Sequence, residues 1–201
     1  MPTGRTSAPP REDQRALPQD EIYEQYLSRA ISEINELGHE LAGRVLGSGH
    51  PLADIFLLKH APGTAELAEG VAFFGRAGQA VLKSVQRLGI DPSILYGTNC
   101  LKSRDPADAE LAPRWLEREI AIVQPKIIVA MGGETVSFLN ALELPLTAPL
   151  EQQLGVQHLT PTIDVLVVPA IEDSLDDQAS KRAFWDAFRA LGEWYEALPP
   201  Y

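Results

Sequence analysis

Apolar positions along the chain follow two different spacings, one typical of helices and the other of buried strands. From Ile22 to Leu41 they recur at helical spacing, which predicts a helix over residues 21–45 with Asp20 as its N-cap. The same spacing predicts further helices at residues 75–89, 108–124, 133–142 and 179–198.

Between these helices lie short runs that are apolar at almost every position. They predict strands at residues 54–58, 94–99, 126–132 and 164–170. Continuous apolar runs are typical of strands covered on both faces, as in parallel sheets. We therefore expect an α/β fold, a three-layer α/β/α sandwich with a central, mainly parallel four-stranded sheet.

The first 19 residues differ in composition, because prolines there are interspersed with polar and charged residues. Such a segment buries too little apolar surface to order itself, so we expect a disordered N-terminal tail at 1–19 and a single domain over 20–201. No apolar run is long enough to cross a membrane, no signal peptide is recognisable, and a single cysteine rules out a disulfide framework. These features predict a cytoplasmic protein.

Charge bears directly on the class of partner. The chain carries 17 bases and 28 acids, a net charge of −11, and residues 141–201 alone contribute 3 bases and 10 acids. Nucleic-acid binding depends on basic patches that neutralise phosphates, so this acidity argues against a strong DNA binder. A local basic groove would still be compatible with it.

Polar residues and turns follow the predicted strands, at residues 59–63, 98–102, 132–134 and 169–173. Because the carboxyl ends of parallel strands meet at one edge of a sheet, any site is expected there. Five blocks around these strand ends occur in a fixed order from Val45 to Trp185: "VLGSGHPLADIFLLKHAPG", "AFFGRAGQAVL", "TNCLKSR", "LEREIAIVQPKIIVAMGGETV" and "KRAFW". Together they resemble the family-4 uracil-DNA glycosylases, enzymes of DNA repair that hydrolyse the N-glycosidic bond of a uracil taken out of the DNA.

The resemblance implies a pocket for the base. Asn99 stands where the family's Asn reads the polar edge of uracil, for which a side-chain amide has the matching donors and acceptor. Phe73 matches the aromatic residue that stacks on the base, although Phe74 is equally available. The structural alternatives are that Asn99 caps the strand end and that Phe73 packs in the core.

The turn Ala61-Pro62-Gly63 matches the "APG" of the family's "GEAPG", whose backbone approaches the base. The family's Gly and Glu are replaced by Lys59 and His60. A glycine lets the backbone approach a ligand closely, so Lys59 is expected to fill or deform that space.

Two side chains are candidates for catalysis. His60 could act as a donor or acid near neutral pH, and Glu66 could orient water. His158 is an alternative donor, and a structural role for His60 is the other interpretation. The family's catalytic His falls on Ala170, in an acidic loop with Glu172, Asp173, Asp176 and Asp177.

The family's four-iron four-sulfur cluster needs four cysteines, and Cys100 is the single cysteine and does not match a ligand position. We therefore expect no cofactor and no metal. Arg76, Lys102 and Arg104 are candidate phosphate contacts.

These departures predict a divergent member of the superfamily with weak or no uracil excision and a retained nucleobase-like pocket. One alternative is an active glycosylase of base-excision repair with altered catalytic residues. Another is a hydrolase or transferase acting on a small nucleoside-like ligand. The expected partners are DNA, bound weakly, or a small nucleobase-like ligand, and no membrane.

Overall fold

Four apolar segments form parallel strands at the centre of the computed structural model, which describes residues 19–198. They run in the order β3-β2-β4-β6. Their bounds are Ile55–Lys59 (β2), Leu95–Asn99 (β3), Ile127–Met131 (β4) and Ile163–Val168 (β6). The predicted four-stranded parallel core is confirmed.

Two further strands extend the sheet to six, and neither was predicted. The two-residue β1 (Ser48–Gly49) pairs antiparallel with β3, and β5 (Gly155–Thr160) pairs antiparallel with β6. Both lie at the edges of the sheet, where partial exposure replaces the continuous apolar pattern of the central strands.

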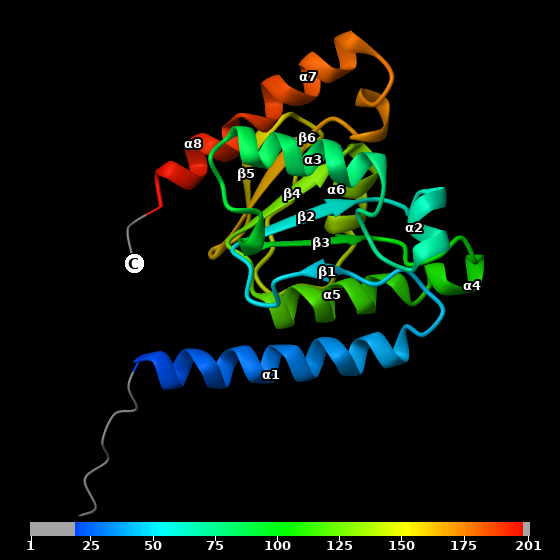
Figure 1. Cartoon of the computed structure of the whole chain (residues 1–201), viewed down its shortest axis with the longest axis vertical. Coiled ribbons are helices and arrows are strands. Elements are labelled where there is room, and N and C mark those ends of the chain that lie inside the picture. Colours follow the sequence, from blue (N-terminus) through cyan, green and yellow to red (C-terminus); the bar gives the residue numbers. More distant parts are fainter. Residues whose placement is uncertain (1–18, 199–201) are drawn as a thin grey trace, which may run out of the picture.

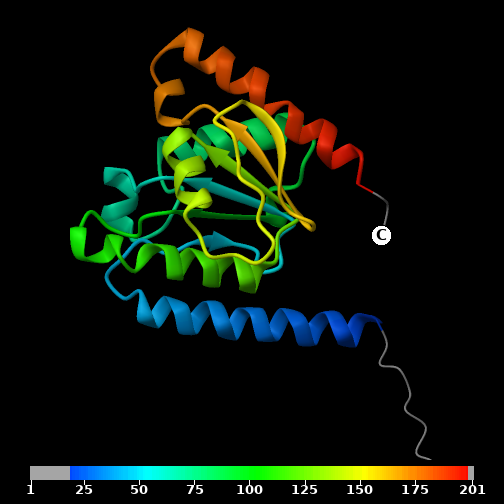
Figure 2. The ribbon, with the colours of Figure 1, turned by 180° about the vertical axis from the view of Figure 1, so that it is seen from behind.

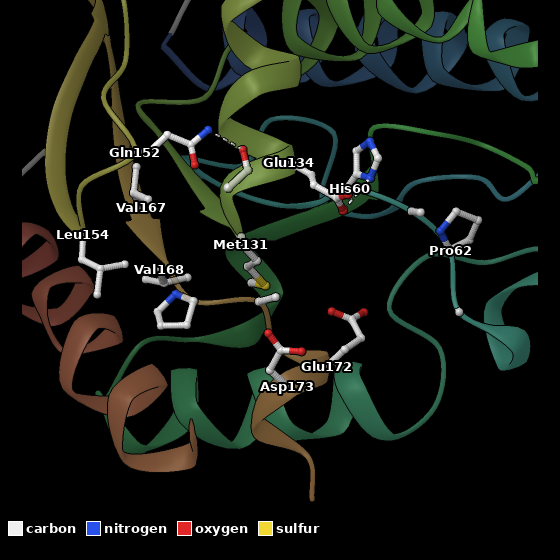
Figure 3. Close-up of a pocket in the computed structure, with 16 residues that line it drawn as sticks. His60, Pro62, Met131, Glu134, Gln152, Leu154, Val167, Val168, Glu172 and Asp173 are labelled. Carbon is white, nitrogen blue, oxygen red and sulfur yellow. Dashed lines mark hydrogen bonds and ion pairs between the residues drawn. The ribbon is translucent and has the colours of Figure 1, made fainter. Parts of the chain in front are cut away.

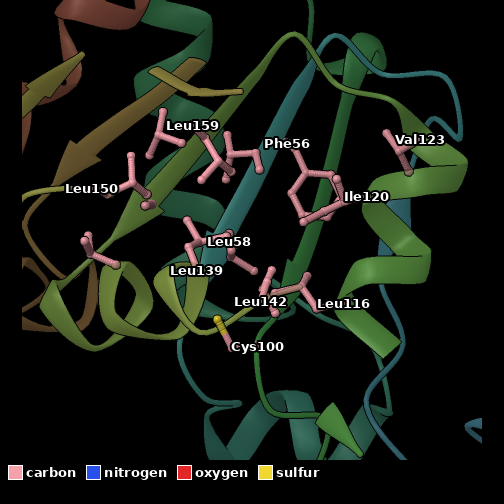
Figure 4. Packing of buried hydrophobic residues seen from close by; sticks show 14 of the residues in the cluster. Phe56, Leu58, Cys100, Leu116, Ile120, Val123, Leu139, Leu142, Leu150 and Leu159 are labelled. Atoms are coloured by element: carbon pink, nitrogen blue, oxygen red, sulfur yellow. The ribbon is translucent and has the colours of Figure 1, made fainter. Parts of the chain in front are cut away.

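Helices cover both faces of the sheet, as expected for three layers (Figures 1 and 2). One face carries α5 (Ala112–Val123) and α6 (Gly133–Asn140), with α1 (Gln19–Glu40) packed mainly against α5. Figure 4 shows the apolar core on this face, where Cys100 is buried. The opposite face carries α3 (Arg76–Arg87), α7 (Gln178–Phe188) and α8 (Ala190–Glu196).

Shorter elements connect these layers. They are α2 (Thr64–Glu69), η1 (Pro92–Ile94), α4 (Pro106–Ala109) and η2 (Glu172–Ser174). Among residues 19–198, no helix has the length and apolarity that a membrane span requires.

Several predicted helix bounds need correction. The first helix begins at Gln19, so Asp20 lies inside it and is not its N-cap. The helix predicted at 108–124 is divided into α4 and α5, because a proline in the first turn of α5 cannot continue a preceding helix. The helix predicted at 179–198 is divided between α7 and α8. Residues 1–18 of the predicted tail lie outside the described residues.

The register of the sheet brings the candidate site together. Lys59 at the end of β2 pairs with Asn99 on β3 and with Met131 on β4. Side chains of paired residues in neighbouring strands point to the same face of a sheet. The three side chains therefore start on the face that carries α3 and α7.

Candidate functional site

A cavity of about 610 Å³ opens at the carboxyl edge of the sheet (Figure 3). The turn after β2, the start of α6 and the segment after β6 form its walls. His60, Ala61, Pro62 and Gly63 line it, as does Ala170, the position of the family's catalytic His. The structure thus brings the predicted turn and His60 into one cavity.

The charged groups of this cavity are mostly carboxylates. Glu134, Glu172 and Asp173 line it together with His60, and no Lys or Arg is among its described lining residues. His60 Nδ1 lies 3.2 Å from Glu134 Oε2, and the imidazole also packs edge-on against Phe138. A cavity with this charge repels phosphate groups.

Lys59 is the most unusual residue of the site. Its side chain is 2% exposed, although it carries an ammonium group. The Nζ atom lies 2.6 Å from Glu66 Oε2 and donates hydrogen bonds to Glu172 Oε1 at 2.7 Å and to the Ala61 carbonyl at 3.0 Å. Because a buried charge is tolerated only when it is paired, these oxygens hold the lysine in place. Lys59 thereby joins β2, α2 and η2.

Glu66 is a buried carboxylate that bonds the segments around the cavity. Its carboxylate accepts the Gly63 backbone N–H at 2.6 Å and the backbone N–H of Phe73, in addition to its contact with Lys59. The side chain is buried and does not line the cavity. Its oxygens are committed to the turn and to Lys59, and a role of Glu66 in orienting a catalytic water stays a prediction.

Phe73 is held in a left-handed backbone conformation, with φ at 58°. A Cβ atom at Gly97 would lie 2.7 Å from the Phe73 ring, so the glycine is what allows the ring to lie on β3. Phe73 packs against the core on the α3 side, and Phe74 is exposed. Neither of the two rings lines the cavity.

Asn99 has no exposed surface, and neither its Oδ1 nor its Nδ2 atom has a hydrogen-bond partner in the described part of the chain. A buried amide without partners is costly and rare, and it calls for an explanation such as a ligand or a bound water. Asn99 does not line the cavity either. Its register neighbour Lys59 is equally buried beside it.

The three candidate phosphate contacts differ in accessibility. Lys102 is fully buried and bonds Glu119 and the Thr98 hydroxyl on the opposite face of the sheet, so it presents no exposed surface to a phosphate. Arg76 is exposed and pairs with Asp176 at 2.6 Å. Arg104 is exposed in the segment before α4.

Comparison with known proteins identifies the family of this chain. The family profile described as the uracil DNA glycosylase superfamily matches residues 46–191. The chain belongs to this superfamily. A type-4 uracil-DNA glycosylase of Sulfurisphaera tokodaii is 34% identical over 103 residues, which are 47% of this chain and 47% of the relative.

The type-4 uracil-DNA glycosylase of Archaeoglobus fulgidus is 30% identical over 111 residues, 51% of this chain and 56% of the relative. That of Thermotoga maritima is 31% identical over 101 residues, 47% of this chain and 53% of the relative. The chain thus spans about half the length of the curated relatives it matches.

The implied iron-sulfur cluster does not fit this member of the superfamily. The sequence has one cysteine, and Cys100 is buried in the apolar core, where burial raises the pKa of its thiol. A cluster needs several thiolates at one place. No four-cysteine cluster can be held.

Sequence reasoning missed two features of the site. One is Glu134, whose carboxylate lies 3.2 Å from His60 Nδ1. It follows the apolar strand closely in "MGGE", and this position could have indicated a site residue. The other is the contact of Glu172 with Lys59, which joins residues 113 positions apart and leaves no pattern in the sequence.

Proposed function

We propose that the protein is a divergent member of the uracil-DNA glycosylase superfamily, with weak or no uracil excision and a nucleobase-like pocket that Lys59 keeps closed. The observation that carries the proposal is the buried Lys59 ammonium, paired with Glu66 and Glu172 beside an unpartnered Asn99. In this arrangement the amide that would read a base is inaccessible.

Lys59 pairs with Asn99 in the sheet and is buried beside it, so we infer that a base reaches Asn99 only if Lys59 moves. That movement would separate the ammonium from two carboxylates and would leave the buried Glu66 without its countercharge. The desolvation cost of an unpaired buried carboxylate opposes the movement. The binding free energy of a base would have to offset this cost, which supports weak recognition.

The charge of the cavity also opposes the chemistry of uracil excision. Negative charge develops on the departing base, and efficient enzymes place a donor against it. Ala170 offers only a methyl group, whereas Glu134, Glu172 and Asp173 bring negative charge to the same cavity. Loss of one such donor commonly lowers the rate about 10²- to 10³-fold, and the nearby carboxylates lower it further.

The test is a glycosylase assay on single-stranded, U·G and U·A oligonucleotides at low salt, with the Thermotoga maritima enzyme as the positive reference. We expect the protein to release uracil at least 100-fold more slowly than the reference, in keeping with the loss of a donor. Release at a comparable rate that disappears in the Asn99→Ala variant would overturn the proposal.

A gain-of-function variant sharpens this test. Lys59→Gly together with Ala170→His restores the family's residues at both departures, so excision should rise above that of the unmodified protein. The matched control keeps both changes and adds Asn99→Ala, which should abolish the gain. Equal activity in all forms would show that neither departure limits excision.

A second candidate is a binding protein or enzyme for a small nucleoside-like ligand. A cavity of about 610 Å³ lies within the range of small-molecule sites, and its carboxylates favour an uncharged or cationic ligand over a phosphorylated one. Thermal unfolding with free uracil, uridine and cytidine tests this candidate. A rise in Tm that Asp173→Asn weakens would support it, and no rise with any of the three would argue against it.

A further inference from the structure

The candidate cavity combines apolar surface with carboxylates on two facing walls (Figure 3). Glu134 lies on the wall formed by the start of α6, and Glu172 and Asp173 lie on the wall formed by the segment after β6. Met131 and Val168 line the cavity between them, from the ends of β4 and β6. A flat ring in the cavity can therefore contact apolar atoms, including a methionine sulfur, while carboxylates lie at its edges.

The negative charge of this cavity is not neutralised by its surroundings. The Lys59 ammonium contacts Glu172, but the buried Glu66 carboxylate already balances that ammonium. Asp173 is exposed and has no hydrogen bond or ion pair with another residue in the range 19–198. The partner of Glu134 is the His60 imidazole, which carries a charge only when it is protonated. The cavity therefore attracts a cation and repels an anion.

The charge of a departing base decides what such a cavity has to supply. Uracil leaves as an anion, so its excision depends on a hydrogen-bond donor, and the methyl group of Ala170 provides none. A purine alkylated at its N7 or N3 atom already carries a positive charge on the ring. When its N9–C1′ bond breaks, the bonding electron pair goes to N9 and the base leaves uncharged. This departure needs no donor against the base.

The positive charge passes to the sugar as the bond breaks. C1′ then has the character of an oxocarbenium ion, which nearby carboxylates stabilise. Water attacks C1′, its oxygen forms the new C1′–O bond, and one proton is released. Asp173 is free to accept this proton and to pass it to solvent, because no described residue bonds its carboxylate.

We propose that the cavity takes positively charged N-alkylated purines and that the protein hydrolyses their N-glycosidic bond. The inference rests on the proposed function, because it concerns the same cavity and names the class of base that the cavity favours over uracil. Glu134, Glu172 and Asp173 surround the cationic ring, and Lys59 keeps its place because a base in the cavity does not have to reach Asn99.

The experiment measures the release of bases from three substrates at low salt. They are DNA methylated with dimethyl sulfate, which carries 7-methylguanine and 3-methyladenine, the free nucleoside 7-methyl-2′-deoxyguanosine, and DNA that contains uracil. We expect methylpurine release above the protein-free rate and about 100-fold faster than uracil release, because only uracil suffers from the missing donor. Comparing the first two substrates shows whether the base is taken from DNA or from a free nucleoside.

A matched pair of variants tests the role of charge. Asp173→Asn should lower methylpurine release about fivefold, the effect of one charge pair at about 4 Å in water-like surroundings, and should not lower uracil release. Asp176→Asn removes the same charge from the same acidic segment, but this residue pairs with Arg76 and does not line the cavity, so both rates should stay unchanged. Damage to the fold would lower both rates together.

Two results would overturn the inference. They are methylpurine release no faster than the protein-free rate from both methylated substrates, and equal effects of Asp173→Asn and Asp176→Asn on that release. The uracil substrate tests the proposed function separately. Uracil release at the rate of the Thermotoga maritima enzyme would overturn the proposed function, whereas slow uracil release without methylpurine release would overturn this inference and leave the proposed function standing.

Discussion

Replacing Lys59 with methionine should destabilise the protein, because it removes the ammonium and retains a straight side chain of similar length. Lys59 and Glu66 have side chains that are 2% and 3% exposed, with Nζ 2.6 Å from Oε2. Removing one partner of a buried ion pair costs about 3–5 kcal/mol of unfolding free energy. The Gly63 and Phe73 N–H groups still bond Glu66, so we expect about 3 kcal/mol.

The two carboxylates that face Lys59 should contribute unequally. Glu172 is 47% exposed, and an ion pair of that exposure contributes at most about 1 kcal/mol. Glu172→Gln should therefore have a small effect, whereas Glu66→Gln leaves both the ammonium and two backbone N–H groups with a weaker acceptor. Comparing Glu66→Gln with Glu172→Gln shows how the loss of the same charge changes the free energy of unfolding at a buried and at an exposed position.

Urea unfolding at pH 7 gives all of these free energies. The double variant Lys59→Met/Glu66→Gln contains no buried charge at this site, so its loss should fall short of the sum of the single losses by about 1–3 kcal/mol. Additive losses, or a loss below 1 kcal/mol for Lys59→Met, would refute the reasoning that the buried pair holds the site closed.

Three further predictions concern other groups. Burial raises the pKa of the Cys100 thiol, so a thiol reagent should modify it only after unfolding, and rapid labelling of the native protein would contradict this. The Arg44 guanidinium lowers the pKa of the Asp108 carboxyl in the folded protein. The ionised carboxylate therefore stabilises the folded protein above the unfolded pKa of about 3.9, and this contribution is lost as the pH falls through the lower folded pKa. Asp108→Asn should therefore flatten the loss of stability below about pH 4 in acid-unfolding curves. Glu119→Gln breaks the buried pair with Lys102 and should cost about 3–5 kcal/mol in urea unfolding, with a loss below 1 kcal/mol as the contrary result.

The central sheet was predictable because each of its strands is buried on both faces. Runs such as "KIIVAMG" leave no other low-cost arrangement than a strand inside an α/β sandwich. The edge strand β5 has exposed and partly buried positions in alternation, and its "GVQHLT" also reads as a loop. β1 has two residues, too few to show any period.

The topology also predicted which residues meet at the carboxyl edge, and register delivered Lys59 beside Asn99. The topology could not predict that the Lys59 side chain would be buried there. That outcome depends on contacts with Glu66 and with Glu172, which lies 113 positions away from Lys59 in the sequence. A Lys at a strand end is exposed in most proteins, and its burial here follows from two carboxylates whose positions only the fold determines.

The same limit applies to charge. A net charge of −11 describes the average over the chain, whereas a ligand meets one surface at a time. The segment after β6 lines the cavity with three carboxylates, and it also lines a second hollow whose charged residues are Arg76, Lys83, Arg87 and Lys181. The two surfaces therefore have opposite electrostatic preferences, and the net charge of the chain predicts neither of them. The carboxylates of the cavity argue against a phosphate inside it, whatever the charge of the surface beside it.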